Sequence, residues 1–305
     1  MEQAKHCAVC AQGLKRRFGK TWALDGFSCE MPHGHIYGLL GRNGAGKSTF
    51  LRIATAQTGA TQGRVLIDGE NPKENARALG KICFISDKPE FGGLRRVSDV
   101  LKSAKALYPQ WNDAQAKKLC EVFELDVKRK TKGLSRGMQT AVGLVCGLAS
   151  QAPITIFDEP SLGLDAVIRE RFYDALLESY MENPRTIVLS THLIDEVSRV
   201  LETAVMIDKG RLVMQESVES LRTRAICVSG LREEVDAACQ KLNVLRTEEF
   251  AGRTAKYILL DKEQTPDFPD SLRTEPVSLQ RLFVLLTDKD TTEGGVSHGT
   301  ADFNA

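Results

Sequence analysis

The chain has 305 residues, 42% hydrophobic and 27% charged, enough to bury a core as one large domain or two smaller ones. Its 41 Lys and Arg residues nearly balance its 40 Asp and Glu residues, so overall charge does not favour nucleic acid as a partner. No apolar stretch approaches the ~20 residues that cross a bilayer, and the N-terminus lacks a secretory pattern, so we expect a cytoplasmic protein.

The first segment, residues 8 to 40, alternates apolar and polar residues around turn signals such as Gly19-Lys20 and Asp25-Gly26. This pattern predicts short antiparallel strands. His6, Cys7 and Cys10 form a cluster near the start of the chain that could be half of a metal site, but no second CxxC or HxxxH follows to complete the four ligands of a structural zinc site. Ordinary buried thiols are therefore the favoured interpretation, and disulfides are not expected.

The middle of the chain alternates apolar runs with helical spacing. A strand at Ile36 to Leu40 leads through a glycine-rich loop into a helix, and residues 94 to 126 read as a helical insert. Further on we expect a helix after Ser135, strands at Ile154 to Phe157 and Thr186 to Leu189, and a helix between them. Such alternation predicts an α/β fold with a parallel sheet covered on both faces.

The last part of the chain carries fewer signals. Lys209-Gly210 reads as the turn of a closing hairpin. Residues 217–287 suggest a small C-terminal α/β appendage, and residues 288–305 contain few large apolar residues and suggest a disordered tail.

The glycine-rich loop fits the pattern G-x-x-x-x-G-K-[ST] of a phosphate loop. Glycines allow successive backbone N–H groups to point at phosphate oxygens, and the following helix N-terminus adds partial positive charge. Lys47 would bridge the β and γ phosphates of ATP, and the Ser48 hydroxyl would ligate Mg²⁺. The predicted ATP-binding residues here are Gly41, Arg42, Asn43, Gly44, Ala45, Gly46, Lys47, Ser48 and Thr49. The competing interpretation is a glycine-rich turn with an exposed lysine.

Two carboxylates, Asp158 and Glu159, end the apolar strand that begins at Ile154. Ligands of open α/β sheets sit at the C-terminal ends of strands, so both acids can face the phosphate loop. We expect Asp158 to hold the Mg²⁺ shell and Glu159 to polarise the attacking water. Without the phosphate loop, a solvated Asp-Glu turn would be the simpler interpretation.

Leu134-Ser135-Arg136-Gly137-Met138-Gln139 precedes the acidic strand, and by itself reads as an ordinary helix N-cap. The order of phosphate loop, Leu-Ser-x-Gly, Asp-Glu-Pro, Gly-Leu-Asp and His resembles the nucleotide-binding subunit of ABC transporters. The resemblance covers about residues 8 to 215. It implies a P-loop NTPase fold, with a RecA-like core sheet, an antiparallel β subdomain and a helical insert. The implied ATPase domain spans residues 1–216, with its helical subdomain at residues 88–140.

The resemblance also implies roles for single residues. In that family two subunits meet head to tail, so Ser135, Arg136, Gly137 and Met138 would contact the ATP held by a second ATPase subunit, identical or related. The segment Ser161 to Asp165 would couple the two sites. Asp165 would lie near the nucleotide, His192 would contact the γ-phosphate, and Phe18 would stack on adenine.

Two departures from the family pattern stand out. Asp87 occupies the position of a glutamine that ligates Mg²⁺; an aspartate can still do so, and we expect Asp87 to join Ser48 and Asp158 as metal ligands. In the segment Leu134 to Gln139, which matches the family's signature sequence and is called the signature below, Arg136 and Met138 replace the commonest glycine and glutamine. This variant resembles bacterial exporter-like subunits.

These features favour the ATPase subunit of a membrane transporter, peripheral on the inner face of the cell membrane, with a separate transmembrane permease subunit. Export is favoured because Val277 to Thr287 resembles the closing segment of drug-exporter and bacitracin-type subunits. The alternative is a soluble ABC-type ATPase that acts on DNA or ribosomes, but its long coiled-coil insertion or second cassette is absent. A guanine-reading Asn-Lys-x-Asp stretch is also absent, which weighs against a GTPase.

Overall fold

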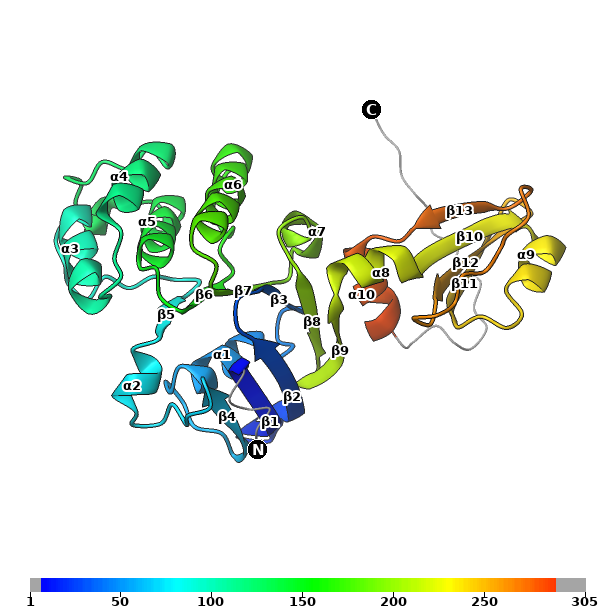
Figure 1. The fold of residues 1–305 in the computed structure, drawn as a ribbon, viewed down its shortest axis with the longest axis horizontal. Coiled ribbons are helices and arrows are strands. Elements are labelled where there is room, and N and C mark those ends of the chain that lie inside the picture. The colour runs from blue at the N-terminus through cyan, green and yellow to red at the C-terminus, as the bar shows by residue number, and fades with distance from the viewer. Residues whose placement is uncertain (1–6, 289–305) are drawn as a thin grey trace. The chain divides into compact units, whose positions relative to one another are not determined.

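The computed structural model describes residues 7–288, and the chain divides into two compact units after Val218 (Figure 1). The first unit contains every residue predicted to bind nucleotide. The second unit follows from Glu219 onward. Apart from Asp288, the tail expected at residues 288–305 lies outside the described residues. Within the described part of the chain, no helix is long and apolar enough to cross a membrane.

The centre of the first unit is a six-stranded sheet with the order β5-β6-β7-β3-β8-β9. Neighbouring strands are parallel except at the β8–β9 hairpin, whose turn is the predicted Lys209-Gly210. All residues of β3, β6 and β7 are buried, as expected for parallel strands covered on both faces. The strands are β3 (Ile36–Leu40), β5 (Ile82–Ile85), β6 (Ile154–Asp158), β7 (Thr186–Thr191), β8 (Thr203–Asp208) and β9 (Arg211–Ser217).

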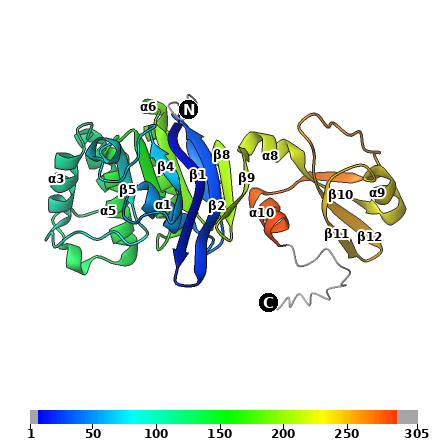
Figure 2. The same ribbon diagram turned by 90° about the horizontal axis from the view of Figure 1, so that it is seen from below.

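A three-stranded antiparallel sheet with the order β2-β1-β4 completes the strands of this unit. The prediction of short strands was wrong, because β1 (Cys7–Phe18) and β2 (Thr21–Pro32) each contain 12 residues. Figure 2 shows them as a long pair beside α1. Register shifts and the positive φ of Gly13 interrupt the alternation that a sequence pattern relies on. The third strand is β4 (Gln62–Ile67).

Seven helices lie in the described part of the first unit, and α3 to α6 form a group on one side of the sheet (Figure 1). The helical insert is present as α3 and α4, and Asn112 caps α4 by accepting a hydrogen bond from the Gln115 N–H. The helices are α1 (Lys47–Ala54), α2 (Ala76–Leu79), α3 (Val97–Leu107), α4 (Asp113–Val122), α5 (Arg136–Ala149), α6 (Ala166–Glu182) and α7 (Ile194–Val197).

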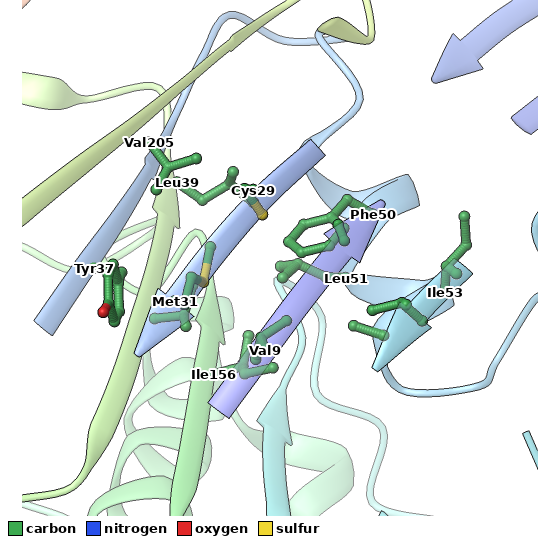
Figure 3. Close-up of a cluster of buried hydrophobic side chains, with 14 of the residues drawn as sticks. Val9, Cys29, Met31, Tyr37, Leu39, Phe50, Leu51, Ile53, Ile156 and Val205 are labelled. Carbon is green, nitrogen blue, oxygen red and sulfur yellow. The ribbon is translucent and has the colours of Figure 1, made fainter. Parts of the chain in front are cut away.

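The main core lies where both sheets pack around α1 (Figure 3). Phe50 of α1 packs against Phe27 of β2, with ring centroids 5.0 Å apart. Leu39 of β3 and Ile156 of β6 belong to the same buried cluster. This packing fixes the start of α1 against the ends of β3 and β6, where the phosphate loop begins and the acidic residues lie.

The second unit is built on a four-stranded antiparallel sheet with the order β11-β12-β10-β13. It has its own core, which includes Ile226, Val228, Val235 and Ile258. Its strands are β10 (Ala225–Leu231), β11 (Val244–Phe250), β12 (Arg253–Leu259) and β13 (Arg273–Pro276). Its helices are α9 (Arg232–Ala238) and α10 (Leu279–Thr287), and α8 (Val218–Arg224) links the two units.

Candidate nucleotide-binding site

The predicted phosphate loop joins β3 to α1 at the carboxyl end of the parallel sheet. Gly44 and Gly46 adopt positive φ angles of 81° and 112°. A Cβ on Gly46 would lie 2.6 Å from the Ala23 carbonyl oxygen, so this position accepts only glycine without rearrangement. Among residues 7–288, no side chain caps the start of α1, which leaves its first N–H groups available to a phosphate.

Lys47 is buried at the base of this loop, with 5% of its side chain exposed. Its Nζ donates hydrogen bonds to the Gly41 and Arg42 carbonyl oxygens at 2.6 and 3.3 Å. The same Nζ lies 3.4 Å from Glu159 Oε1. The ammonium group is therefore held between the phosphate loop and the second predicted acid.

Asp158 ends β6 opposite Ser190 of β7, whose hydroxyl donates to Asp158 Oδ1 at 2.7 Å. Burial raises the pKa of the Asp158 carboxyl, and the charges of Glu159 and Asp87 raise it further. Hydrogen bonds with Ser190 and Ser48 oppose this rise. Of the other two predicted metal ligands, Ser48 thus forms a hydrogen bond with Asp158, and Asp87 acts on Asp158 through its charge.

This group of oxygen donors fits Mg²⁺. Within residues 7–288, no group of three or more His, Cys, Asp or Glu side chains could hold a metal ion by itself. Mg²⁺ in nucleotide sites takes one or two carboxylates and completes its shell with phosphates and water, so no such group is required. A bound cation would reduce the electrostatic repulsion that Glu159 and Asp87 exert on Asp158.

Glu159 follows Asp158 with a left-handed backbone, at a φ of 51°. Its Oε2 lies 2.9 Å from His192 Nδ1 and accepts a hydrogen bond from the Thr191 hydroxyl at 3.0 Å. The side chain is 12% exposed, so it reaches solvent only at its edge. Lys47, Glu159 and His192, which are distant in the sequence, thus form one contiguous group.

The signature residues lie at the start of α5. Ser135 caps the helix, its hydroxyl accepting the Met138 N–H at 3.3 Å, and Ser135 and Arg136 are exposed. A Cβ on Gly137 would lie 2.5 Å from the Gly163 carbonyl oxygen, so α5 packs closely against the segment after Glu159. Asp165 caps α6 by accepting the Ile168 N–H at 2.9 Å.

Phe18 ends β1, and 51% of its surface is exposed. The Arg16 guanidinium lies over its ring, 4.7 Å from the centroid, and Arg16 Nη1 donates to the Gly59 carbonyl oxygen at 2.7 Å. Sequence reasoning missed Arg16, Ser190 and Thr191. Their positions in the sequence could have indicated them. Ser190 and Thr191 directly precede His192 at a strand end, and Arg16 lies two residues before Phe18 in a strand, so the two side chains share a face.

A phosphate loop beside an acidic strand end, on this mostly parallel sheet, defines a P-loop NTPase. The family model described as ABC transporter matches residues 24–162. Bacitracin transport ATP-binding protein BcrA of Enterococcus faecalis is 30% identical over 216 residues, which cover 70% of each chain. The chain therefore belongs to the family of ABC transporter ATP-binding proteins, which are ATPases.

Two further similarities extend this assignment. ABC transporter ATP-binding protein YtrB of Bacillus subtilis is 23% identical over 277 residues, covering 89% of this chain and 95% of YtrB. A solved ATP-binding subunit of an ABC transporter superposes with a TM-score of 0.64 at 22% identity, covering 71% of this chain and 92% of that one, which shows the fold. Other relatives are named for lantibiotic transport, daunorubicin resistance and Nod factor export.

Proposed function

We propose that this chain is the ATPase subunit of an exporter and works at the inner face of the cell membrane with a separate transmembrane permease. The proposed ATPase activity rests on the position of Glu159. Its Oε1 lies 3.4 Å from Lys47 Nζ, and its Oε2 lies 2.9 Å from His192 Nδ1. Export is supported by relatives named for bacitracin and lantibiotic transport and for Nod factor export.

In this proposal Glu159 orients a water molecule and accepts its proton during attack on the γ-phosphate. Lys47 binds the β and γ phosphates, His192 contacts the γ-phosphate, and the exposed face of Phe18 stacks on adenine. Ser48, Asp87 and Asp158 would hold Mg²⁺, which neutralises phosphate charge when bound.

The proposal includes a head-to-tail dimer of ATPase subunits. Ser135 and Arg136 are exposed, and Gly137 and Met138 are half-buried, so the start of α5 can meet the ATP of a second subunit. Gly137 packs against Gly163 in the same chain. The segment Ser161 to Asp165 would therefore sense both sites, since it follows Glu159 and contacts the signature helix.

A basic surface on the helical insert supports docking of a membrane partner. It consists of Arg95, Arg96, Lys128, Arg129, Lys130 and Lys132, which are all exposed. Within the described residues, none of these side chains has a carboxylate within 4.0 Å. An adjoining hollow of about 660 Å³ has an apolar part and a mostly cationic edge; its lining includes Pro89, Phe91 and Leu94, the single acid Glu90, and Arg95, Lys130 and Lys132. Apolar walls and a cationic rim suit a cytoplasmic segment that carries both apolar and acidic residues.

Backbone hydrogen bonds join the two segments that carry this basic surface. The Thr131 N–H donates to the Arg95 carbonyl oxygen at 3.0 Å, and the Val97 N–H donates to the Arg129 carbonyl oxygen at 3.1 Å. An antiparallel bridge pairs Arg96 with Lys130. Changing side chains on this surface should therefore alter its charge and leave its backbone in place.

The test is affinity purification of the tagged chain from detergent-solubilised membranes of its own host. We expect a polytopic membrane protein to accompany it, and the triple variant R95E/K130E/K132E to lose most of that protein because rim charges control association. The matched control reverses three exposed lysines elsewhere, K73E/K117E/K241E, and should retain the partner. Recovery of the tagged chain repeatedly without any polytopic protein would contradict the transporter assignment.

The direction of transport needs a separate test. Deleting the gene should make the host more sensitive to one or more amphipathic antibiotics from a screened panel, because an exporter removes such compounds from the cell. A deletion strain that instead fails to accumulate an external nutrient would indicate import.

A further inference from the structure

Two adjacent hydroxyl residues at the end of β7 face the two adjacent acids at the end of β6. Ser190 donates to Asp158 Oδ1 at 2.7 Å, and Thr191 donates to Glu159 Oε2 at 3.0 Å. Ser190 and Thr191 are fully buried. Each predicted acid thus has its own hydroxyl donor, supplied by the neighbouring parallel strand.

The backbone explains how consecutive side chains meet consecutive partners. Side chains of a regular strand point alternately to opposite faces. The left-handed conformation of Glu159 interrupts this alternation, and the Glu159 N–H donates to the Ser190 carbonyl oxygen at 2.7 Å. Such a conformation is costly for a residue other than glycine and persists only where surrounding contacts enforce it. Thr191 is one of those contacts.

The orientation of the Thr191 hydroxyl is also fixed. Its oxygen accepts the Leu193 N–H at 3.0 Å, so its own proton is directed at Glu159. The Thr191 carbonyl oxygen accepts the Gly41 N–H at 3.3 Å. Thr191 therefore joins the first residue of the phosphate loop to the carboxylate proposed as the base.

We propose that Thr191 is a positioning residue for hydrolysis: it holds Glu159 Oε2 so that Oε1 faces the phosphate loop. This inference rests on the proposed role of Glu159. Oε1 lies 3.4 Å from Lys47 Nζ, on the side where the γ-phosphate would bind. His192 shares Oε2 but is also proposed to contact the γ-phosphate. Thr191 is then the donor that remains on Glu159 when His192 engages the nucleotide.

Ser190 has the corresponding relation to Asp158. Its hydroxyl donates to Asp158 Oδ1 at 2.7 Å and so fixes the orientation of that carboxylate. The pair of hydroxyls therefore separates the two acids into fixed and different orientations, which suits their different proposed roles.

The test compares Thr191→Val, which removes the hydroxyl at nearly constant volume, with Thr191→Ser, which keeps it. We expect the valine variant to lower kcat about tenfold, because a hydrogen bond to a charged group is lost, with little change in KM. The serine variant should stay within about twofold of wild type. Steady-state hydrolysis gives kcat and KM, and binding of a fluorescent ATP analogue gives affinity.

Thr155→Val is the matched control, since Thr155 is a fully buried threonine of β6 whose hydroxyl donates to the Ala152 carbonyl oxygen at 3.4 Å and to no other group in the described part of the chain. It should leave kcat unchanged. Equal losses of kcat in T155V and T191V, or an unchanged kcat in T191V, would overturn the inference. A comparable loss of kcat in T191S would also overturn it, because that variant keeps the hydroxyl.

Glu159→Gln separates this inference from the function on which it rests. If E159Q hydrolyses ATP at the wild-type rate, the role of Glu159 is wrong and the positioning role of Thr191 is wrong with it. If E159Q is inactive while T191V is fully active, only the inference about Thr191 is wrong. When E159Q is inactive and T191V is slow, the double variant should be no slower than E159Q, since Thr191 acts through Glu159.

Discussion

At the scale of single residues, the two carboxylate oxygens of Glu159 contact different groups. One carboxylate oxygen faces Lys47, and the other faces Thr191 and His192. The two donors on Oε2 leave Oε1 as the oxygen available to a water molecule near the phosphate loop. Glutamine keeps the shape of this side chain but cannot accept a proton as a carboxylate does.

We therefore expect Glu159→Gln to lower hydrolysis by ~10²–10⁴-fold, the range for removing a well-placed general base. ATP binding should be retained, because Lys47 and the loop glycines are unchanged. Steady-state phosphate release and fluorescent-analogue binding measure the two effects. Loss of binding in parallel with hydrolysis would instead indicate a structural role for Glu159.

The residues of the site differ in how far the sequence predicts them. The phosphate loop, Asp158 and Glu159 were predicted because their chemistry is local: glycine spacing in one case, a carboxylate pair after an apolar strand in the other. Ser190 and Thr191 were missed because their partners are 32 positions away. Only the pairing of β6 with β7 brings them together.

At the scale of elements, the start of α5 packs tightly against the segment that follows β6. The Thr140 hydroxyl donates to the Arg136 carbonyl oxygen at 3.1 Å and lies 3.2 Å from the Leu162 carbonyl oxygen. Gly137 leaves no room for a side chain against Gly163. A displacement of the signature would therefore move the segment that follows Glu159.

Gly137→Ala should disturb this contact, because its Cβ would meet a backbone oxygen at 2.5 Å and the backbone must shift. We expect hydrolysis to fall at least tenfold, a loss of about 1.4 kcal/mol in transition-state stabilisation, from a small misplacement of site groups. The control is Gly133→Ala, whose Cβ would meet nothing within 4 Å. Equal activity of the two variants would show that the close contact has no functional consequence.

Elements also differed in how far they could be predicted. β3, β6 and β7 are short, fully buried apolar runs, and their pattern was readable. In the second unit β13 is exposed at every position, and it and β11 lacked a recognisable strand pattern. The lengths of β1 and β2 were underestimated because bulges hide long strands from a rule based on alternation.

At the scale of the whole molecule, the proposed head-to-tail dimer requires each chain to contribute to two different ATP sites. Its phosphate loop and Glu159 would act on its own nucleotide, whereas Ser135 and Gly137 would act on that of a second subunit. The domain division after Val218 leaves all of these residues in the first unit. The signature is exposed at Ser135 and Arg136, as contact with a second subunit would require.

Mixing two inactive variants tests this arrangement, if the chain forms a dimer with itself. Glu159→Gln removes the proposed base but keeps the signature, whereas Ser135→Arg blocks the signature but keeps the base. A mixed dimer contains one site with both halves intact. Random pairing before ATP is added should therefore restore about a quarter of wild-type activity, since half of the dimers are mixed and each has one working site.

The control mixes the double variant Lys47→Ala/Ser135→Arg with Glu159→Gln. In this mixed dimer the intact signature faces a phosphate loop that lacks the Lys47 side chain, so neither site is complete. It should stay inactive. Activity of the first mixture equal to the sum of its separate components would contradict the head-to-tail arrangement, because signature and base would then act within one chain or on different ligands. Restored activity in the first mixture alone requires that Ser135 of one subunit serve Glu159 of the other.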